Sequence, residues 1–183
     1  MAMGHGDDPE ARQIAPARLK SIPLALRVAV YGVGFLALVL GGVPYLFHQI
    51  DGRLPAVHVE VGPLRIAGVV LAVVGVVLYL QAAGVLISRG KGGHVEFDPP
   101  TQFVVTGPYR YVRNPVAGCL LASMLGEAIA FSSTGIFIMF CVAAGLAHVQ
   151  VTRLEEPLLR KRYGEAYTQY CARVPRWIPR RPR

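Results

Sequence analysis

Side chains that could do chemistry collect in two stretches of this sequence, residues 101–118 and 153–179. The first reads TQFVVTGPYRYVRNPVAG, and the second contains an acidic pair, Glu155 and Glu156, followed by Tyr and Arg residues. Aromatic faces attract cations, and carboxylates hold ammonium groups. These residue types are suited to binding a charged ligand. Tyr and Arg pairs are also typical of membrane-interface anchoring, which is the alternative reading.

Apolar blocks separate and flank these stretches. Residues 28–47 and 66–87 contain no charged residue, and each approaches the roughly 20 apolar residues that cross a bilayer as a helix. Residues 116–131 and 136–151 form two shorter blocks around a turn-like Ser-Ser-Thr-Gly, which predicts a helical hairpin. The sequence therefore predicts an all-α polytopic membrane protein with about four transmembrane helices, at about 24–48, 64–87, 116–131 and 135–152.

The basic residues gather at the edges of these blocks. The chain has 19 Lys and Arg against 11 Asp and Glu, yet residues 48–63 contain a single Arg or Lys, Arg53. The positive-inside rule then places both termini and residues 88–115 in the cytoplasm, and it explains the basic excess without nucleic acid. We expect a bacterial plasma-membrane protein with a flexible arm (1–21) and one domain (22–183) that ends in a cytoplasmic cap (153–183).

Several other chemistries lack their sequence patterns. There is no Gly-x-Gly-x-x-Gly after a strand, no HExxH and no Walker sequence, and the three Cys residues are widely spaced, so no metal site is expected. Two polar residues lie inside apolar blocks. We expect Glu127 to pair with a polar group on a neighbouring helix. We expect His148 to lie below the site, on a helix face similar to that of Glu155.

Four blocks of the C-terminal half occur in a recognisable order: GPYRYVRNP, EEPLL, YGEAY and VPRWIP. Together they resemble the isoprenylcysteine carboxyl methyltransferase and phospholipid methyltransferase superfamily of integral membrane enzymes. The usual core motif of that superfamily is Arg-His-Pro-x-Tyr-x-Gly. Here Asn114 stands in place of the His and Ala117 in place of the Tyr.

The resemblance implies that S-adenosylmethionine is bound in the cap, between the loop after the second span and the C-terminal segment. It implies a catalytic contribution from Glu155 and Asn114, contact of Glu155 and Arg153 with the acceptor, and a solvated position for Glu156. The implied cofactor contacts are His94, Thr101, Gln102, Phe103, Val104, Tyr109, Arg113, Asn114, Pro115, Val116 and Ala117.

The predicted activity is S-adenosylmethionine-dependent methylation of a lipidic or small hydrophobic acceptor. A prenylcysteine carboxylate, a phospholipid amine and a thiol are the acceptors that we consider, and membrane lipids are expected partners of the Arg-rich tail. Two alternatives stay open. One is an NADPH-dependent membrane reductase of related architecture, and the other is a non-catalytic membrane scaffold, which the changes at Asn114 and Ala117 favour.

Overall fold

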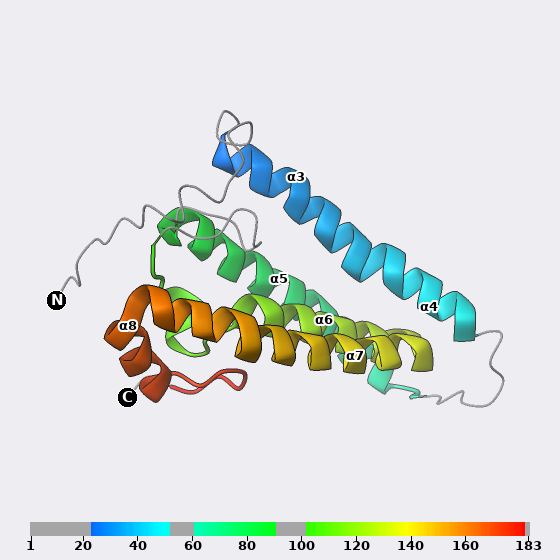
Figure 1. Cartoon of the computed structure of the whole chain (residues 1–183). Helices are drawn as coiled ribbons and strands as arrows, with labels where there is room; N and C mark the ends of the chain where they lie inside the picture. The colour runs from blue at the N-terminus through cyan, green and yellow to red at the C-terminus, as the bar shows by residue number, and fades with distance from the viewer. Residues whose placement is uncertain (1–22, 52–60, 91–101, 182–183) are drawn as a thin grey trace.

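The computed structural model describes residues 23–51, 61–90 and 102–181, and in this part of the chain every regular element is a helix (Figure 1). This confirms the predicted all-α fold. The elements in chain order are α3 (Leu24–Ala37), a π-helical turn η1 (Leu38–Gly42), α4 (Val43–Asp51), α5 (Leu64–Gly90), a short 3-10 turn η2 (Gly107–Arg110), α6 (Pro115–Phe131), α7 (Thr134–Gln150), a second π-helical turn η3 (Val151–Glu155) and α8 (Glu156–Arg173).

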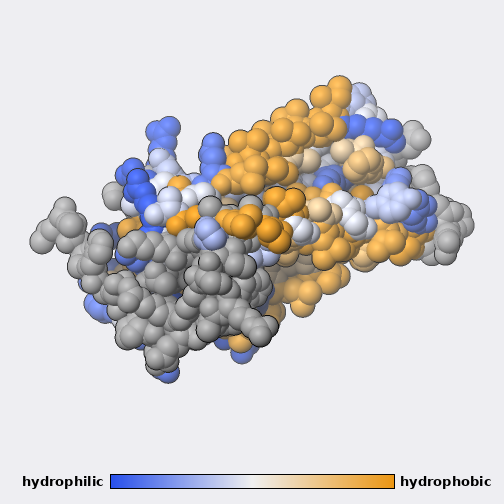
Figure 2. All heavy atoms as spheres, turned by 90° about the horizontal axis from the view of Figure 1, so that it is seen from above, coloured by the Kyte–Doolittle hydropathy of each residue, from blue (hydrophilic) through white to orange (hydrophobic). Residues whose placement is uncertain are grey.

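The helices are those of a polytopic membrane protein. By length and apolar composition, three helical stretches can cross a membrane: Val30–Asp51, Leu64–Gly90 and the helix Thr134–Arg173, while α6 is apolar but shorter. Large apolar side chains such as Val69 and Leu146 are exposed along them. Figure 2 shows apolar side chains over the middle of one face and hydrophilic side chains towards the ends. Such a surface suits a hydrocarbon solvent.

Helices α5 and α6 pack with their backbones in close contact. An added Cβ on Gly68 would lie 2.8 Å from the carbonyl oxygen of Gly126, and one on Gly126 would lie 2.7 Å from the carbonyl oxygen of Gly68. The Ser123 hydroxyl donates to the Cys119 carbonyl at 3.0 Å and lies 3.3 Å from the Ala72 carbonyl. Small residues permit such an approach between membrane helices. The close packing fixes the end of α5 relative to α6.

At the far end of the bundle, Asp51 ties α4 to α7. Its carboxylate accepts hydrogen bonds from the Ser133 hydroxyl and, at 2.7 Å, from the Gly135 amide. Ser133 is also the N-cap of α7, because its hydroxyl oxygen accepts a hydrogen bond from the Ile136 amide at 3.0 Å. An apolar cluster lies beside this junction, formed by Met124, Ala128, Ile136 and Met139.

At the opposite end, α7 continues through η3 into α8 without a break, as the long yellow-to-orange helix of Figure 1 shows. The C-terminal end of α5, residues 102–114, α8 and the C-terminal segment all lie at this end of the molecule. From here on, the cap means residues 102–114 together with residues 153–181, which are the described part of the predicted C-terminal cap. The helices thus bring the two chemically rich stretches of the sequence to one place.

The contact between α5 and α6 predicts a sharp difference between two glycines of α6. Gly126→Ala should lower the free energy of unfolding by about 1 to 3 kcal/mol, because its methyl group would collide with the backbone of Gly68 and Ala72. Gly118 has open space around its Cβ position, so Gly118→Ala should be neutral or stabilising. Thermal unfolding in detergent measures both, and equal melting temperatures would contradict this packing.

Candidate functional site

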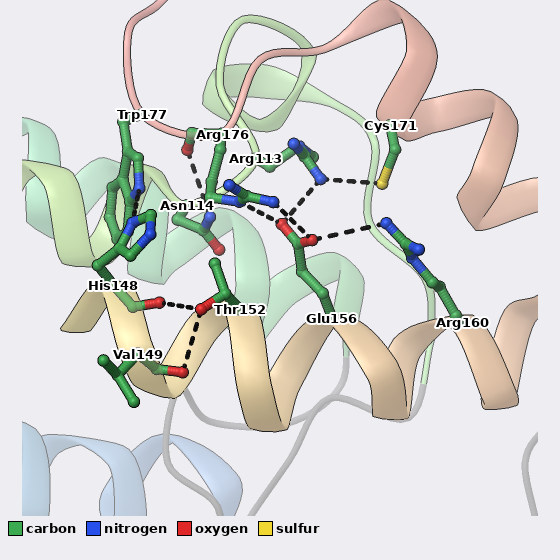
Figure 3. Close-up of polar contacts among 10 residues, drawn as sticks. All are labelled: Arg113, Asn114, His148, Val149, Thr152, Glu156, Arg160, Cys171, Arg176 and Trp177. Carbon is green, nitrogen blue, oxygen red and sulfur yellow. Dashed lines mark hydrogen bonds and ion pairs between the residues drawn. The ribbon is translucent and has the colours of Figure 1, made fainter. Parts of the chain in front are cut away.

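The centre of the cap is the carboxylate of Glu156, at the first position of α8. Glu156 is only 4% exposed. Its Oε1 accepts hydrogen bonds from Arg113 Nη1 at 2.8 Å and Arg176 Nε at 2.6 Å, and its Oε2 accepts one from Arg176 Nη2 at 2.9 Å. Arg160 Nη2 lies 3.8 Å from Oε2. Figure 3 shows the three guanidinium groups converging on this one carboxylate.

These contacts keep Glu156 ionised. The hydrogen bond from Arg176 and the positive charges of Arg113, Arg176 and Arg160 hold the pKa of Glu156 below its usual value, against the opposing effect of burial. The same hydrogen bond raises the pKa of Arg176. A carboxylate with a lowered pKa is a poor proton acceptor. Glu156 is therefore suited to positioning the arginines around it.

The Glu156 contacts join segments that are far apart in the sequence. Arg113 precedes α6, and Arg176 follows α8. Two backbone hydrogen bonds join the same segments: the Arg113 amide donates to the Pro175 carbonyl at 2.9 Å, and the Arg180 amide donates to the Tyr111 carbonyl at 3.0 Å. The C-terminal segment is thus fastened along residues 111–114 by both backbone and charge.

An aromatic cluster forms the neighbouring part of the cap. The Phe103 ring stacks on Tyr163 with centroids 4.8 Å apart, and it meets Tyr167 and Tyr170 edge-on at 5.9 and 5.3 Å. Tyr163 and Tyr167 lie on opposite sides of a kink at Gly164, whose φ of 54° and ψ of −127° suit glycine almost alone. The kink lets both parts of α8 contact one ring.

Tyr109 links this cluster to α5. Its carbonyl accepts a hydrogen bond from the Tyr170 hydroxyl at 2.6 Å, and its own hydroxyl lies 3.4 Å from the Ala82 carbonyl. Burial raises the pKa of the Tyr109 phenol, and the charge of Glu155 is among the smaller causes of that rise. Tyr109 is thus a neutral, buried side chain.

Several residues predicted from the sequence to contact the cofactor come together here. Phe103 belongs to the aromatic cluster, and the Tyr109 carbonyl accepts a hydrogen bond from Tyr170 of that cluster. Arg113 contacts Glu156 and donates to Cys171 Sγ at 3.0 Å, and Asn114 Nδ2 donates to the Arg176 carbonyl at 3.3 Å. The others among them are Val104, which is buried, Gln102, which is half-buried, and Pro115, Val116 and Ala117, which form the first turn of α6. His94 and Thr101 lie outside the described residues.

The predicted solvated position of Glu156 is wrong, and the π-helical turn η3 gives the reason. A π-helix has i→i+5 hydrogen bonds and so takes more residues per turn than an α-helix. After η3, Glu156 rather than Glu155 therefore lies on the helix face that carries His148. Figure 3 shows the side chains of His148 and Glu156 on one side of the helix. Glu155 is half-buried and lies 3.4 Å from Gln150 Nε2. Arg153 is exposed on η3.

The sequence did not predict that some buried polar atoms of the cap and of α6 would lack a hydrogen-bond partner. Within the part of the chain that the structure describes, Thr106 Oγ1 and Arg113 Nε are buried without a hydrogen-bond partner. Glu127 Oε2 is likewise buried without a hydrogen-bond partner, so the pairing predicted for Glu127 is not found for that oxygen. Arg176 was not among the predicted site residues, although it lies in the VPRWIP block and that block could have pointed to it. Thr106 lies in an ordinary loop sequence that gave no such signal.

Comparison with known proteins connects this region to an enzyme family. A family model described as phospholipid methyltransferase matches residues 64–166, which is more than half of the chain and includes Arg113 and Glu156. Over 80 residues the chain is 30% identical to the nickel-cobalt-cadmium resistance protein NccN of Alcaligenes xylosoxydans xylosoxydans. That match covers 44% of this chain and 37% of NccN, so the chain spans little more than a third of that relative.

The arginine contacts predict a pH-dependent effect of Glu156→Gln. At neutral pH the variant should lose about 3 kcal/mol of unfolding free energy, because it leaves the nearly buried Arg113 without its counter-charge. The pKa of Glu156 is lowered in the fold, so its stabilisation is complete above the ordinary Glu pKa and is lost as pH falls through the lowered value. The difference between wild type and variant should therefore shrink in acid.

Thermal unfolding across pH measures this difference. Glu165→Gln is the matched control, because Glu165 is exposed on the same helix and lies 3.4 Å from Gln169. Its effect should be small at every pH. Equal stability of the two variants at neutral pH would contradict a central role for the Glu156 charge.

Proposed function

The chain belongs to the phospholipid methyltransferase family, and on that premise we propose that it transfers a methyl group from S-adenosylmethionine to a lipidic or small hydrophobic acceptor. One observation supports this most strongly. The four ordered sequence blocks meet in the cap, because Arg113, Glu156 and Arg176 share one charge cluster while Tyr163 of the YGEAY block stacks on Phe103.

The residues of the cap fit the chemical parts of this cofactor. S-adenosylmethionine supplies a methyl group on a sulfonium, which a nucleophile can displace, together with an adenine, a ribose and a methionine part. Thr106 Oγ1 and Arg113 Nε are buried polar atoms without partners in the described part of the chain, and they suit hydroxyl or carboxylate oxygens. Phe103 and Tyr163 add aromatic rings to the same cap. The contacts predicted from His94 to Ala117 remain part of the proposal.

We assign different roles to the two neighbouring carboxylates. Glu156 is a positioning residue, since it holds Arg113 and Arg176 and its lowered pKa makes it a poor base. Glu155 is half-buried, and it is the carboxylate that we propose to face the acceptor. Asn114 would support the site by holding the Arg176 carbonyl, and the exposed Arg153 would contact a charged part of the acceptor.

In methyl transfer to a nucleophile, the protein mainly aligns the methyl donor with the acceptor and excludes water. A carboxylate acceptor is already ionised at neutral pH and needs no base, whereas a thiol, with a pKa of about 8.5, or an ammonium must lose a proton first. Only for those two would Glu155 serve as a base. The exposed apolar surfaces of the spans favour an acceptor that arrives from the bilayer.

Two alternatives stay open, a membrane reductase and a non-catalytic scaffold, and they differ from a methyltransferase in the cofactor that they would bind. An NADPH-dependent reductase would bind the nicotinamide, and a scaffold would bind neither ligand. The name of NccN concerns metal resistance; among the described residues of this chain no group of three His, Cys, Asp or Glu side chains could hold a metal ion. The family match is what supports methyl transfer over these alternatives.

Titration of the protein in lipid nanodiscs tests the proposed cofactor. S-adenosylmethionine should bind and NADPH should not compete with it. Thr106→Val should weaken the affinity about five- to thirtyfold, because it removes one hydrogen-bonding group from a buried position. Thr168→Val is the control, since Thr168 is exposed and its hydroxyl donates to the Gly164 carbonyl within α8. Binding of NADPH alone would favour the reductase, and binding of neither would favour the scaffold.

Glu155→Gln tests the acceptor side separately. If Glu155 positions or activates the acceptor, turnover should fall at least about tenfold, equivalent to about 1.4 kcal/mol of transition-state stabilisation, while S-adenosylmethionine affinity changes little. The assay should try prenylated cysteine analogues, phosphatidylethanolamine and small hydrophobic thiols. Glu165→Gln should leave both quantities unchanged. Wild-type turnover in Glu155→Gln would remove this carboxylate from the mechanism.

A further inference from the structure

The C-terminal segment turns back towards the membrane-spanning helices after α8. Its outgoing part is fixed by the hydrogen bond between the Arg113 amide and the Pro175 carbonyl, and its returning part by that between the Arg180 amide and the Tyr111 carbonyl. The turn therefore lies at residues 177–179. In Figure 1 this red segment runs beside the long α7–α8 helix and reverses there. We call residues 177–179 the tip.

A contact with α7 places the tip at the level where the apolar span ends. Trp177 Nε1 donates a hydrogen bond to His148 Nδ1 at 3.2 Å, and the two rings lie 6.3 Å apart (Figure 3). His148 belongs to the last turn of α7, which also exposes Leu146 and Val149. Tryptophan is enriched in membrane proteins between the hydrocarbon and the headgroups, and Trp177 would lie there if the membrane-spanning part of this helix ends with α7.

The tip combines an exposed apolar side chain with flanking positive charge. Ile178 is 80% exposed, more than any other large apolar residue in the described part of the chain. The sequence around it reads Arg-Trp-Ile-Pro-Arg-Arg, and Arg180 and Arg181 are exposed. An apolar tip between arginines matches a membrane surface, because the side chain reaches the acyl boundary while the guanidinium groups meet phosphates.

We propose that the tip inserts into the interfacial layer of the bilayer and that Arg180 and Arg181 bind anionic phospholipid headgroups there. Charge complementarity selects anionic lipid, since the whole chain carries a formal charge of +8. The insertion also bears on the cap. Arg176, which donates two hydrogen bonds to Glu156, directly precedes the tip. A tip anchored in the membrane would therefore restrain Arg176 and, through it, the contacts around Glu156. The proposal does not depend on the cofactor or the acceptor.

The sequence provides its own probe, because Trp177 is the single tryptophan of the chain. The full-length protein is reconstituted in phosphatidylcholine vesicles with and without phosphatidylglycerol. Lipids brominated on their acyl chains should quench Trp177, whereas aqueous iodide should quench it poorly. Phosphatidylglycerol should strengthen the quenching by brominated lipid about twofold, through the two exposed arginines.

Three variants separate the parts of the proposal. Ile178→Asn should reduce quenching by brominated lipid and increase quenching by iodide. Arg180→Gln combined with Arg181→Gln should abolish the effect of phosphatidylglycerol. Arg173→Gln is the matched control, since Arg173 is exposed at the last turn of α8, and it should behave as wild type.

Measurements on the wild-type protein decide the proposal even if a variant fails to fold. Quenching of Trp177 by iodide but not by brominated lipid, in both vesicle types, would overturn insertion and leave the tip as a surface for water or another protein. Equal quenching in neutral and anionic vesicles would overturn the binding of anionic headgroups.

Discussion

The burial of one ionised carboxylate is the constraint on which the cap depends. A charge removed from water is costly unless it is paired and hydrogen-bonded. Glu156 meets this requirement because Arg113, which precedes it in the sequence, and Arg176, which follows it, both hydrogen-bond to its carboxylate. The same contacts therefore hold α8, the loop before α6 and the C-terminal segment together. A cap built from loops and helix ends needs such a tie to stay preorganised.

The membrane helices deliver these groups to one another. Close backbone contact between α5 and α6 holds together the two helices on either side of Tyr109 and Arg113, and Asp51 anchors the start of α7 at the other end of the bundle. Helix α7 then runs unbroken into α8. The rotation introduced by η3 decides which of the two neighbouring carboxylates turns inward. A turn inside one helix thus connects the geometry of the spans to the electrostatics of the cap.

The sequence predicted the helices well because apolar length is a strong signal in a membrane protein. The predicted segment 116–131 became α6 at Pro115–Phe131, and 135–152 became α7 at Thr134–Gln150. The ordered motif blocks also named Arg113 and the acidic pair. The direction of Glu156 could not be predicted, because no residue pattern marked the π-helical turn at Val151–Glu155. Likewise, no local signal could show that Arg176 closes on a residue twenty positions earlier, since that contact depends on the path of the C-terminal segment.

Hydrogen exchange at two backbone amides tests the central claim most directly. The amides of Arg113 and Arg180 donate to Pro175 and Tyr111, and both bonds require the C-terminal segment to stay in place. Exchange is measured in nanodiscs for wild type, Glu156→Gln, Arg176→Gln and the double variant. If the Glu156 cluster holds the cap, each single variant should speed exchange at both amides at least about tenfold, or about 1.4 kcal/mol, and the double variant should add little. Wild-type protection of both amides in the two single variants would contradict the account.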